Sequence, residues 1–138
     1  MAKGSCLCGK VTYEASEVAP NITKCHCKIC QKTSGSAYGD YVVAPIDGFK
    51  WTSGESLMTR YESSPGNFRN FCSVCGTHMP TAHPQMGIYF VQPGTLDTNE
   101  PLVESTHMFL RSKAPWHKQA EGLTGVEQNG AMRWIVCL

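Results

Sequence analysis

Apolar and polar residues alternate in short runs along most of this chain, which is the pattern of half-buried β-strands. The first clear run is Val11-Thr12-Tyr13-Glu14-Ala15. Further runs rich in β-branched or aromatic residues occupy positions 38–44, 49–52, 57–62, 67–71, 87–91 and 106–110, and residues 133–137 form either a last strand or a loosely held tail. We predict that the runs between residues 38 and 71 form a meander of antiparallel strands, so the fold class is mainly β.

Turn-forming residues separate these runs and leave little room for helices. Ser64-Pro65-Gly66 lies between two of the runs, and Ala19-Pro20-Asn21 breaks the pattern before the central cysteines. The pattern allows only a turn or two of helix after Cys30 and another near residues 116–119. Residues 31–36, with the sequence QKTSGS, are predicted to form a polar loop, which either lies plainly on the surface or contacts a small molecule.

Length and charge exclude several classes of protein. The 138 residues fit one domain, which we place at residues 1–138. The chain has 12 Lys and Arg against 11 Asp and Glu, a net charge of +1, so we expect no nucleic-acid partner, because such a partner normally demands a basic excess. No apolar run is long enough for a signal peptide or a membrane span, and we expect a cytoplasmic protein with no membrane partner.

Cysteine is the residue type that points to chemistry. There are eight cysteines, and all but Cys137 fall into three groups: Cys6/Cys8, Cys25/Cys27/Cys30 and Cys72/Cys75. In a small secreted protein, this number would indicate a disulfide framework, whereas in the reducing cytoplasm such closely spaced cysteines are more often metal ligands. Nothing in the sequence indicates export, so we favour metal binding over disulfides.

Two pairs that are distant in the sequence, Cys6/Cys8 and Cys72/Cys75, together supply four thiolates. Gly76 follows the last of them, as expected for a tight metal-binding turn. A zinc ion with four cysteine ligands keeps no open coordination position, and its binding free energy contributes to folding. We predict a structural zinc here that ties the first strand to the end of the meander.

The remaining group, Cys25, Cys27 and Cys30, supplies one thiolate fewer than a tetrahedral zinc needs. The fourth ligand is either a substrate or an internal side chain, and the internal candidates are the five histidines and Cys137. The His26 side chain points away from the metal if the segment is extended, because successive side chains alternate in direction. A cysteine that follows an apolar run, as Cys137 does, is more typical of a buried thiol. We therefore favour a second zinc with an open position.

An open zinc with three thiolate ligands has a particular chemistry. Three thiolates make the ion a weak Lewis acid, so the site is poorly suited to activating water. It is better suited to binding the thiol of a substrate, which then stays ionised and nucleophilic at neutral pH. We expect the substrates to be a small thiol and an electrophile such as an aldehyde.

Five motifs, in order along nearly the whole chain, resemble the glutathione-dependent formaldehyde-activating family, which includes centromere protein V. They are residues 4–9 (GSCLCG), 25–30 (CHCKIC), 71–76 (FCSVCG), 93–97 (PGTLD) and 112–116 (SKAPW). The resemblance implies a β-tent fold of small antiparallel sheets, a structural zinc on Cys6, Cys8, Cys72 and Cys75, and a second zinc on Cys25, Cys27 and Cys30. It also implies a carbon–sulfur lyase activity that condenses glutathione with formaldehyde to S-(hydroxymethyl)glutathione.

Other residues are candidates for substrate binding and proton transfer. The cationic side chains that could hold the carboxylates of a thiol such as glutathione, unless they are solvated surface charges, are Lys28, Lys32, Arg69, Arg111 and Lys113. The loop at residues 32–36 is a candidate for stabilising the oxyanion. Trp116 either walls the pocket or anchors the core, and His78 and His117 are candidate proton carriers.

Two other functions fit the same cysteines. One is a non-catalytic, zinc-stabilised binding module for a protein or small-molecule partner, and the other is a redox or metal-buffering thiol protein. A binding module would typically carry a long basic or disordered extension, which this sequence lacks. We therefore favour an enzyme.

Overall fold

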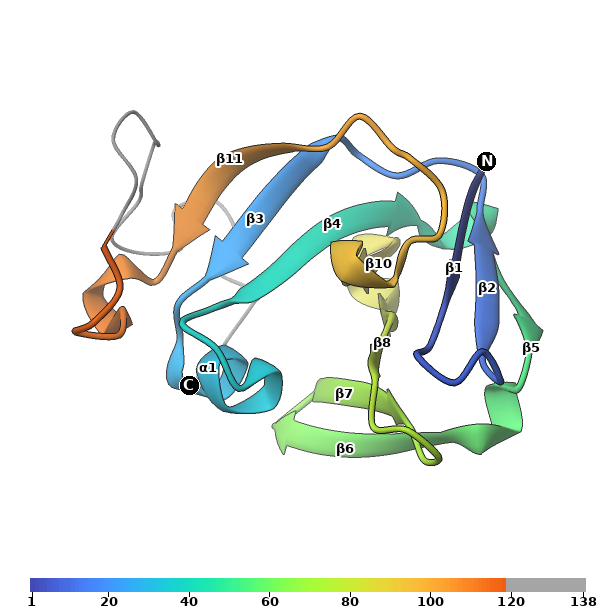
Figure 1. Ribbon diagram of the computed structural model, residues 1–138, viewed down its shortest axis with the longest axis horizontal. Helices are drawn as coiled ribbons and strands as arrows, with labels where there is room; N and C mark the ends of the chain where they lie inside the picture. Colours follow the sequence, from blue (N-terminus) through green and yellow to red (C-terminus); the bar gives the residue numbers. More distant parts are fainter. Residues whose placement is uncertain (119–138) are drawn as a thin grey trace.

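The structure, a computed structural model, describes residues 1–118 and consists mainly of three small β-sheets (Figure 1). The first sheet has the order β1 (Ala2–Ser5), β2 (Thr12–Ala15), β5 (Phe49–Ser53). The central sheet has the order β11 (Val103–Met108), β3 (Asn21–Cys25), β4 (Gly39–Pro45), β10 (Ile88–Val91), β9 (Thr81–His83). The third has the order β6 (Met58–Ser64), β7 (Asn67–Cys72), β8 (His78–Met79).

Helical structure is short throughout this part of the chain. The α-helix α1 covers Lys28–Ser34, and the 3-10 turns are η1 (Ile46–Gly48), η2 (Glu55–Leu57), η3 (Pro84–Met86), η4 (Pro93–Thr95) and η5 (Leu110–Ser112). Within residues 1–118, no helix has the length and apolar character needed to cross a membrane.

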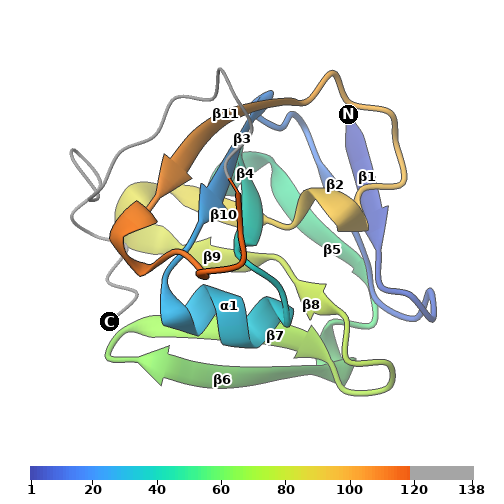
Figure 2. The same ribbon diagram turned by 60° about the vertical axis from the view of Figure 1, so that its left-hand side comes forward.

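The sheets are arranged around a shared interior. The central sheet curves above the β6–β7 hairpin, the first sheet closes one end, and α1 lies at the other end between the central sheet and the hairpin (Figures 1 and 2). The prediction of a mainly β fold of small sheets is confirmed. The pairs are antiparallel except for β3 with β11, which is parallel.

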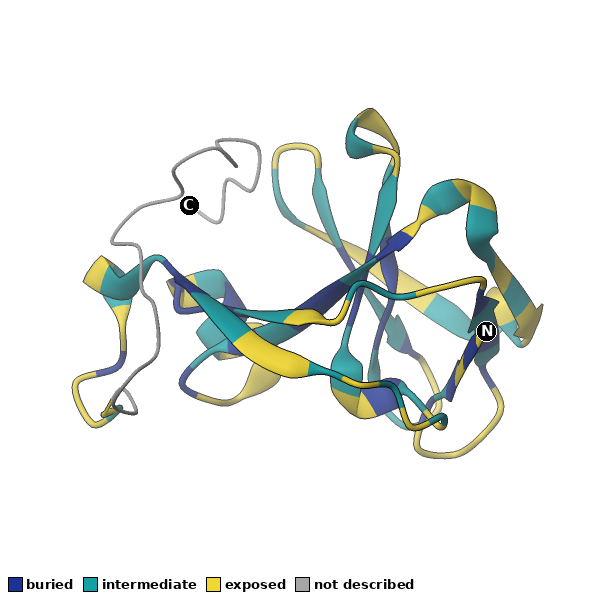
Figure 3. Ribbon diagram, turned by 90° about the horizontal axis from the view of Figure 1, so that it is seen from above, coloured by how far each residue is buried: buried dark blue, intermediate teal, exposed yellow. Residues whose placement is uncertain are grey.

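The core has two parts. The larger joins all three sheets through buried side chains such as Tyr13, Val42 and Met79. The Tyr13 hydroxyl is hydrogen-bonded to the Thr95 hydroxyl at 2.7 Å, so this buried phenol keeps a polar partner. The smaller part contains the three central cysteines with Tyr41 and Phe90. Figure 3 shows the buried residues concentrated where the sheets meet. The three-cysteine group is thus part of a packed interior.

The runs predicted from the alternation appear as strands, but the predicted meander is wrong. Of the strands between residues 38 and 72, only β6 and β7 pair with each other. The strand β5 pairs with β2, and β4 lies between β3 and β10. Tyr41, Val42 and Ala44 of β4 are all buried, and a strand buried on both faces belongs in the middle of a sheet.

The strand β3 was missed by the sequence pattern. Its residue Lys24 is 5% exposed, although Lys is rarely buried unless it is paired. The Lys24 Nζ lies 3.0 Å from an Asp40 oxygen and 2.9 Å from a Glu104 oxygen, so it bridges the two neighbouring strands. Because this ion pair takes the place of an apolar contact, β3 shows no alternation in the sequence.

The segment after the central cysteines is helical. The helical turn predicted after Cys30 is present, but α1 begins at Lys28 and includes most of the predicted loop at residues 31–36. The Cys27 sulfur caps the helix by accepting the N–H of Cys30, and Gly35 ends it with a φ of 61°.

At the other end of the described chain, the strand expected at residues 106–110 is shifted. It is β11, which runs from Val103 to Met108 and stops before Phe109, whose φ is 57°. The strand candidate at residues 133–137 lies outside the described residues, and a single domain over residues 1–138 stays a prediction.

Candidate metal centres

Cys6, Cys8, Cys72 and Cys75 lie together in the structure. Their sulfur atoms are all within 4.8 Å of one another. The Sγ atoms of Cys6 and Cys8 are 3.5 Å apart, and those of Cys8 and Cys72 are 3.9 Å apart. A tetrahedral ion with metal–sulfur bonds of about 2.3 Å places its sulfurs about 3.8 Å apart. The four positions therefore fit a metal ion, and the separations are too long for disulfides.

Hydrogen bonds hold these sulfur ligands in place. The Cys6 sulfur accepts the backbone N–H of Val11 at 3.3 Å. The Thr77 hydroxyl lies 3.2 Å from the Cys75 sulfur and accepts the N–H of Leu7 at 3.0 Å. Hydrogen bonds from the Thr77 hydroxyl and backbone lower the pKa of Cys75 to about 5, which favours the thiolate form that binds metal. Thr77 thus connects the two cysteine pairs.

Local backbone geometry brings the four cysteines together. Gly76 has a φ of 74° and donates its N–H to the Cys72 carbonyl at 2.8 Å, which closes the turn after β7. Cys6 and Cys8 lie in the turn between β1 and β2. The cluster therefore joins the first and third sheets, which is the arrangement expected of a structural metal site.

The second cluster consists of Cys25, Cys27 and Cys30. Cys25 ends β3, Cys27 is the cap of α1, and Cys30 lies in its first turn. All three are buried, and their sulfurs lie within 4.8 Å of one another. The N–H of Cys30 donates to the Cys27 sulfur at 3.3 Å. Three converging thiolates fit a soft metal ion, with a further ligand coming from outside this set.

None of the five histidines belongs to this thiol cluster. The His26 ring points away from it, as predicted, but the ring is 0% exposed and packs against His107 and His117. Cys137, the other internal candidate, lies outside the described residues.

Tyr41 and Arg69 contact the sulfur of Cys30. The Tyr41 hydroxyl lies 3.3 Å from this Sγ, and burial raises the pKa of Tyr41 well above its ordinary value, so the phenol stays protonated and can donate. The Nη2 of Arg69 lies 3.8 Å from the same sulfur. Both side chains are buried, at 8% and 9% exposure. Two buried donors therefore converge on this cysteine.

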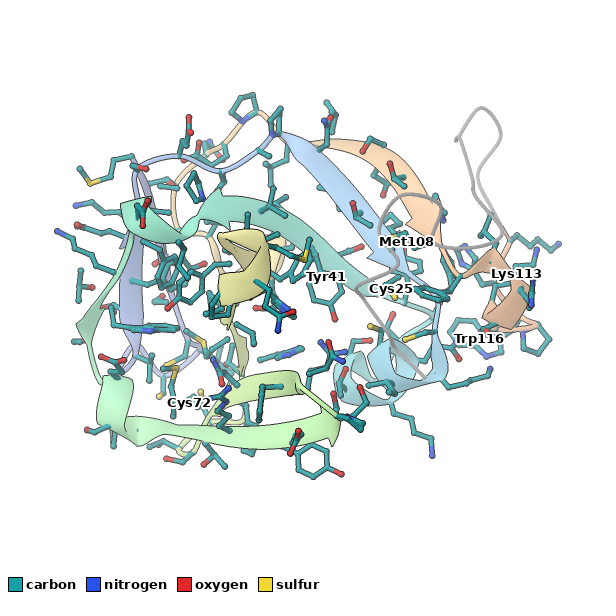
Figure 4. All side chains as sticks on the ribbon, turned by 180° about the vertical axis from the view of Figure 1, so that it is seen from behind. Cys25, Tyr41, Cys72, Met108, Lys113 and Trp116 are labelled. Atoms are coloured by element: carbon teal, nitrogen blue, oxygen red, sulfur yellow. The ribbon has the colours of Figure 1, made fainter. Side chains whose placement is uncertain are left out.

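A cavity of about 270 Å³ reaches this cluster. Cys25, Cys30, Tyr41 and Arg69 line one part of it. Its other walls combine apolar side chains (Val43, Phe90, Met108) with polar ones (Asn21, Thr23, Asn67, His83, Ser105, Thr106). Figure 4 shows Tyr41, Cys25 and Met108 near one another, whereas Lys113 and Trp116 lie at the edge of the molecule. The cavity offers space beside two of the three thiols.

Among the five cationic candidates, only Arg69 lines this cavity. Lys28, Lys32, Arg111 and Lys113 are exposed. Trp116 is 69% exposed and lines no part of the cavity, so the structure supports neither role considered for it. Tyr41 was missed by sequence reasoning. The signal was a tyrosine next to the apolar residues 42–44, since a buried phenol needs a polar partner.

The other predicted polar residues line a second cavity. Thr33, Ser34, Ser36 and His78 lie there, and none of them lines the cavity beside Cys25 and Cys30. Burial and then the charge of Arg69 lower the pKa of His78 to about 4. The segment proposed to stabilise an oxyanion is therefore not at the thiol cavity.

A third group of potential ligands consists of His26, His107 and His117, which we call the histidine cluster. His26 Nε2 and His107 Nδ1 are 2.8 Å apart, and one hydrogen-bonds to the other. Burial, with the charges of His107 and His117, lowers the pKa of His26 to about 4, so its ring is neutral at neutral pH. The predicted proton carrier His117 belongs to this cluster and not to the thiol cavity.

Comparisons with known proteins match these observations. A sequence model described as "Glutathione-dependent formaldehyde-activating enzyme" matches residues 1–112. A Halomonas elongata protein named "Putative glutathione-dependent formaldehyde-activating enzyme" is 29% identical over 126 residues, which cover 84% of this chain and 79% of that protein. The crystal structure of a Rhodobacter sphaeroides protein has a TM-score of 0.59 and 23% identity, and the match covers 72% of this chain and 91% of that one, which supports the fold.

Proposed function

Since the chain belongs to the glutathione-dependent formaldehyde-activating enzyme family, we propose that it joins the sulfur of a small thiol such as glutathione to the carbon of an aldehyde such as formaldehyde. The S–H bond of the thiol breaks and one carbon–sulfur bond forms. The carbonyl π electrons move to the oxygen, which takes up a proton in place of the one that the thiol has lost. The product is an S-hydroxymethyl adduct, and no oxidant or reductant is consumed. The enzyme is then a carbon–sulfur lyase that works in the direction of addition.

The donor atoms favour zinc at both cysteine clusters. Thiolate sulfur prefers ions such as Zn²⁺ over the oxygen-seeking Mg²⁺ and Ca²⁺. Cys6, Cys8, Cys72 and Cys75 would hold a structural ion, and Cys25, Cys27 and Cys30 would hold a second one. When bound, the second ion would supply the positive charge that keeps a substrate thiol ionised at neutral pH.

The observation that carries this proposal is the cavity beside the second cluster. It has the sulfurs of Cys25 and Cys30 on the same wall as the guanidinium of Arg69. A substrate placed there has its reacting sulfur next to the thiol cluster and its negative charge next to a permanent cation. Apolar contacts with Phe90 and Met108 can hold the aliphatic part of the thiol.

Arg69 is the residue best placed to bind negative charge during the reaction. Its guanidinium cannot be deprotonated at physiological pH and offers five N–H donors. The charge that develops on the aldehyde oxygen forms one bond away from the attacked carbon, close to the cluster. A buried, fixed cation is most effective against such a charge because little water competes with it. Arg69 replaces the segment at residues 32–36 in this role.

Tyr41 has a positioning role. Its protonated hydroxyl can donate to the Cys30 sulfur and thereby fix the direction of that side chain. Such outer contacts orient the ligands of a metal and tune their basicity. We place the activity in the cytoplasm, where reducing conditions keep the cysteines and the thiol substrate reduced.

The test follows loss of free ¹³C-formaldehyde by NMR at a fixed glutathione concentration. Protein that has been loaded with zinc should accelerate the loss above the spontaneous rate, and Cys27→Ser protein should not. A rate equal to the spontaneous one for several thiols and aldehydes would exclude the enzyme and leave a non-catalytic binding module.

A further inference from the structure

The histidine cluster has no role in the proposed reaction, yet it is assembled from three separate segments. His26 follows β3, His107 lies on β11, and His117 follows η5. Parallel pairing sets His107 opposite Lys24 and Met108 opposite Cys25, and the N–H of His26 donates to the Met108 carbonyl at 2.9 Å. These contacts bring the first two rings together.

A glutamine side chain positions the third segment. The Gln31 amide donates to the carbonyl of His26 at 2.6 Å and to the carbonyl of Ser112 at 2.8 Å. It therefore joins the end of β3 to the end of η5. The N–H of His117 donates to the Ala114 carbonyl at 3.0 Å, which turns this residue back toward the other two rings. The convergence is thus held by strand pairing, by the Gln31 side chain and by backbone hydrogen bonds, in addition to the contact between the His26 and His107 rings.

The ring nitrogens have more hydrogen-bonding capacity than the surroundings use. One nitrogen of each ring lies within 4.8 Å of one nitrogen of the other two. The only hydrogen bond that the structure gives among these described rings is the one between His26 and His107. His26 Nδ1, His107 Nε2 and His117 Nε2 are buried and have no hydrogen-bond partner. Buried polar atoms are normally satisfied, so such a group in one place needs an explanation.

The chemistry of the rings and of their neighbours indicates what kind of ligand this site could take. The two carboxylates whose charges act on His107, Glu104 and Asp40, are both paired with Lys24. Tyr38 forms an aromatic wall, with its ring 5.2 Å from that of His26 and 5.3 Å from that of His117. Imidazole nitrogen is a ligand for zinc, copper, nickel and iron, and not for magnesium or calcium. Three imidazoles form the donor set of open zinc sites.

We propose that His26, His107 and His117 bind a third metal ion, a divalent ion of the zinc type, distinct from the two cysteine clusters. Imidazole nitrogen binds zinc at about 2.0–2.1 Å. The 2.8 Å hydrogen bond between His26 Nε2 and His107 Nδ1 would then be exchanged for bonds from the rings to the ion. The bound ion would fasten the segment after η5 to the end of β3. His26 would then connect two metal centres, because Cys25 and Cys27 on either side of it belong to the thiol cluster.

The experiment compares metal content between variants of the full-length protein. Each protein is dialysed to equilibrium against Zn²⁺, and zinc per chain is measured by mass spectrometry of the metal. We expect His107→Gln and His117→Gln to contain one zinc fewer than the unmodified protein. His78→Gln, a histidine outside both the histidine cluster and the thiol cavity, is the matched control and should lose none. Circular dichroism verifies folding, and the half-buried His117 is the safer position if His107→Gln does not fold.

Cobalt distinguishes this site from the thiol clusters. Added to protein whose cysteine sites are filled with zinc, Co²⁺ at three imidazoles gives visible bands without the near-ultraviolet charge-transfer band of a thiolate ligand. We expect His117→Gln to lose those bands and Cys27→Ser to keep them. Equal zinc content in His117→Gln and the unmodified protein, or cobalt bands that survive in His117→Gln, would overturn the proposal and leave a hydrogen-bonded structural cluster. The cysteine sites and the thiol reaction would be unaffected by that result.

Discussion

The Nη2 of Arg69 lies 3.8 Å from the Sγ of Cys30, although 39 positions separate the two residues in the chain. Arg69 belongs to β7 of the third sheet, and Cys30 belongs to α1 beside the central sheet. The contact therefore joins two layers across the cavity. Among the lysines and arginines of residues 1–118, Arg69 is therefore the one that a substrate in this cavity would contact.

Substitution of Arg69 tests this contact. We expect Arg69→Gln to lower kcat/KM for formaldehyde consumption about tenfold to a hundredfold, because a fixed charge is lost where negative charge develops. Arg60→Gln is the matched control, since Arg60 stacks on Phe68 of the same hairpin and lines no part of the cavity. A thiol without carboxylates separates two roles for Arg69. If Arg69→Gln also reacts more slowly with this thiol, Arg69 acts on the aldehyde oxygen. If the variant is slower only with glutathione, Arg69 binds a carboxylate of glutathione.

Removal of the Tyr41 hydroxyl should weaken the second centre without unfolding the protein. Tyr41→Phe keeps the ring that packs against Phe90 and loses the contact with Cys30. We expect a loss of about 1 kcal/mol in the free energy of unfolding and about tenfold weaker metal binding at this centre. Chelator competition measures the second quantity. The exposed Tyr61→Phe should change neither, and equal metal affinity in both variants would contradict the role of Tyr41.

The two cysteine clusters should respond differently to loss of a ligand. Cys72 is 0% exposed and joins two sheets, so Cys72→Ser should cost about 5 kcal/mol or more, because metal binding there contributes directly to folding. Cys27→Ser should remain folded and lose one metal ion. Thermal unfolding and metal analysis of the two purified variants check this. A Cys27→Ser protein that unfolds or loses all its metal would contradict the division into structural and substrate-binding centres.

The variant Cys137→Ser tests whether Cys137 is the fourth metal ligand at the second centre. We expect this variant to retain its metal and to keep the thiol addition rate, because we assign the remaining coordination position to the substrate. Loss of one metal ion per chain would instead identify Cys137 as the internal ligand. Metal content and rate are measured on the same preparation.

Acidification should destabilise the protein, and His78 should account for part of this effect. Its pKa is about 4 when folded and 6.5 ordinarily, and burial is the main cause. Between these values the His78 side chain binds a proton in the unfolded chain but not in the folded one. Its contribution to the free energy of unfolding is therefore intact above pH 6.5 and falls as the pH drops toward 4. At pH 5 this amounts to about 2 kcal/mol. The free energy of unfolding, measured with urea at pH 7.5 and at pH 5, should change less between the two pH values in His78→Gln than in the unmodified protein. An equal change in both proteins would contradict this role of His78.

The cysteine pattern was readable from the sequence because ligand spacing is local. Cys25, Cys27 and Cys30 must lie close together whatever the rest of the fold does, and the pair Cys72/Cys75 follows the same rule. The sequence did not indicate which of the five cationic candidates lines the cavity, since this depends on how the side chain is buried between the layers. The strand β3 was hidden for the same reason, because the buried Lys24 finds its partners on two other strands.

The histidine cluster shows a second limit of local patterns. The sequence indicated that His26 points away from the thiols, and the structure agrees. Its partners, His107 and His117, lie far along the chain. His107 reaches it because β11 pairs with β3 in parallel, and His117 follows through the contacts of Gln31. Two parallel strands are not joined by a tight turn, so the sequence contains no turn residues that would predict their pairing.

That parallel pairing also orders events on the ribosome. The strand β3 has left the ribosome when β11, which ends at Met108, has yet to be made. At about 5–20 residues per second, the delay is of the order of ten seconds. During this time one edge of β3 offers unpaired backbone groups to other nascent chains, next to thiols that are open to oxidation. Early capture of metal by the emerging chain would shield those thiols before β11 closes the edge.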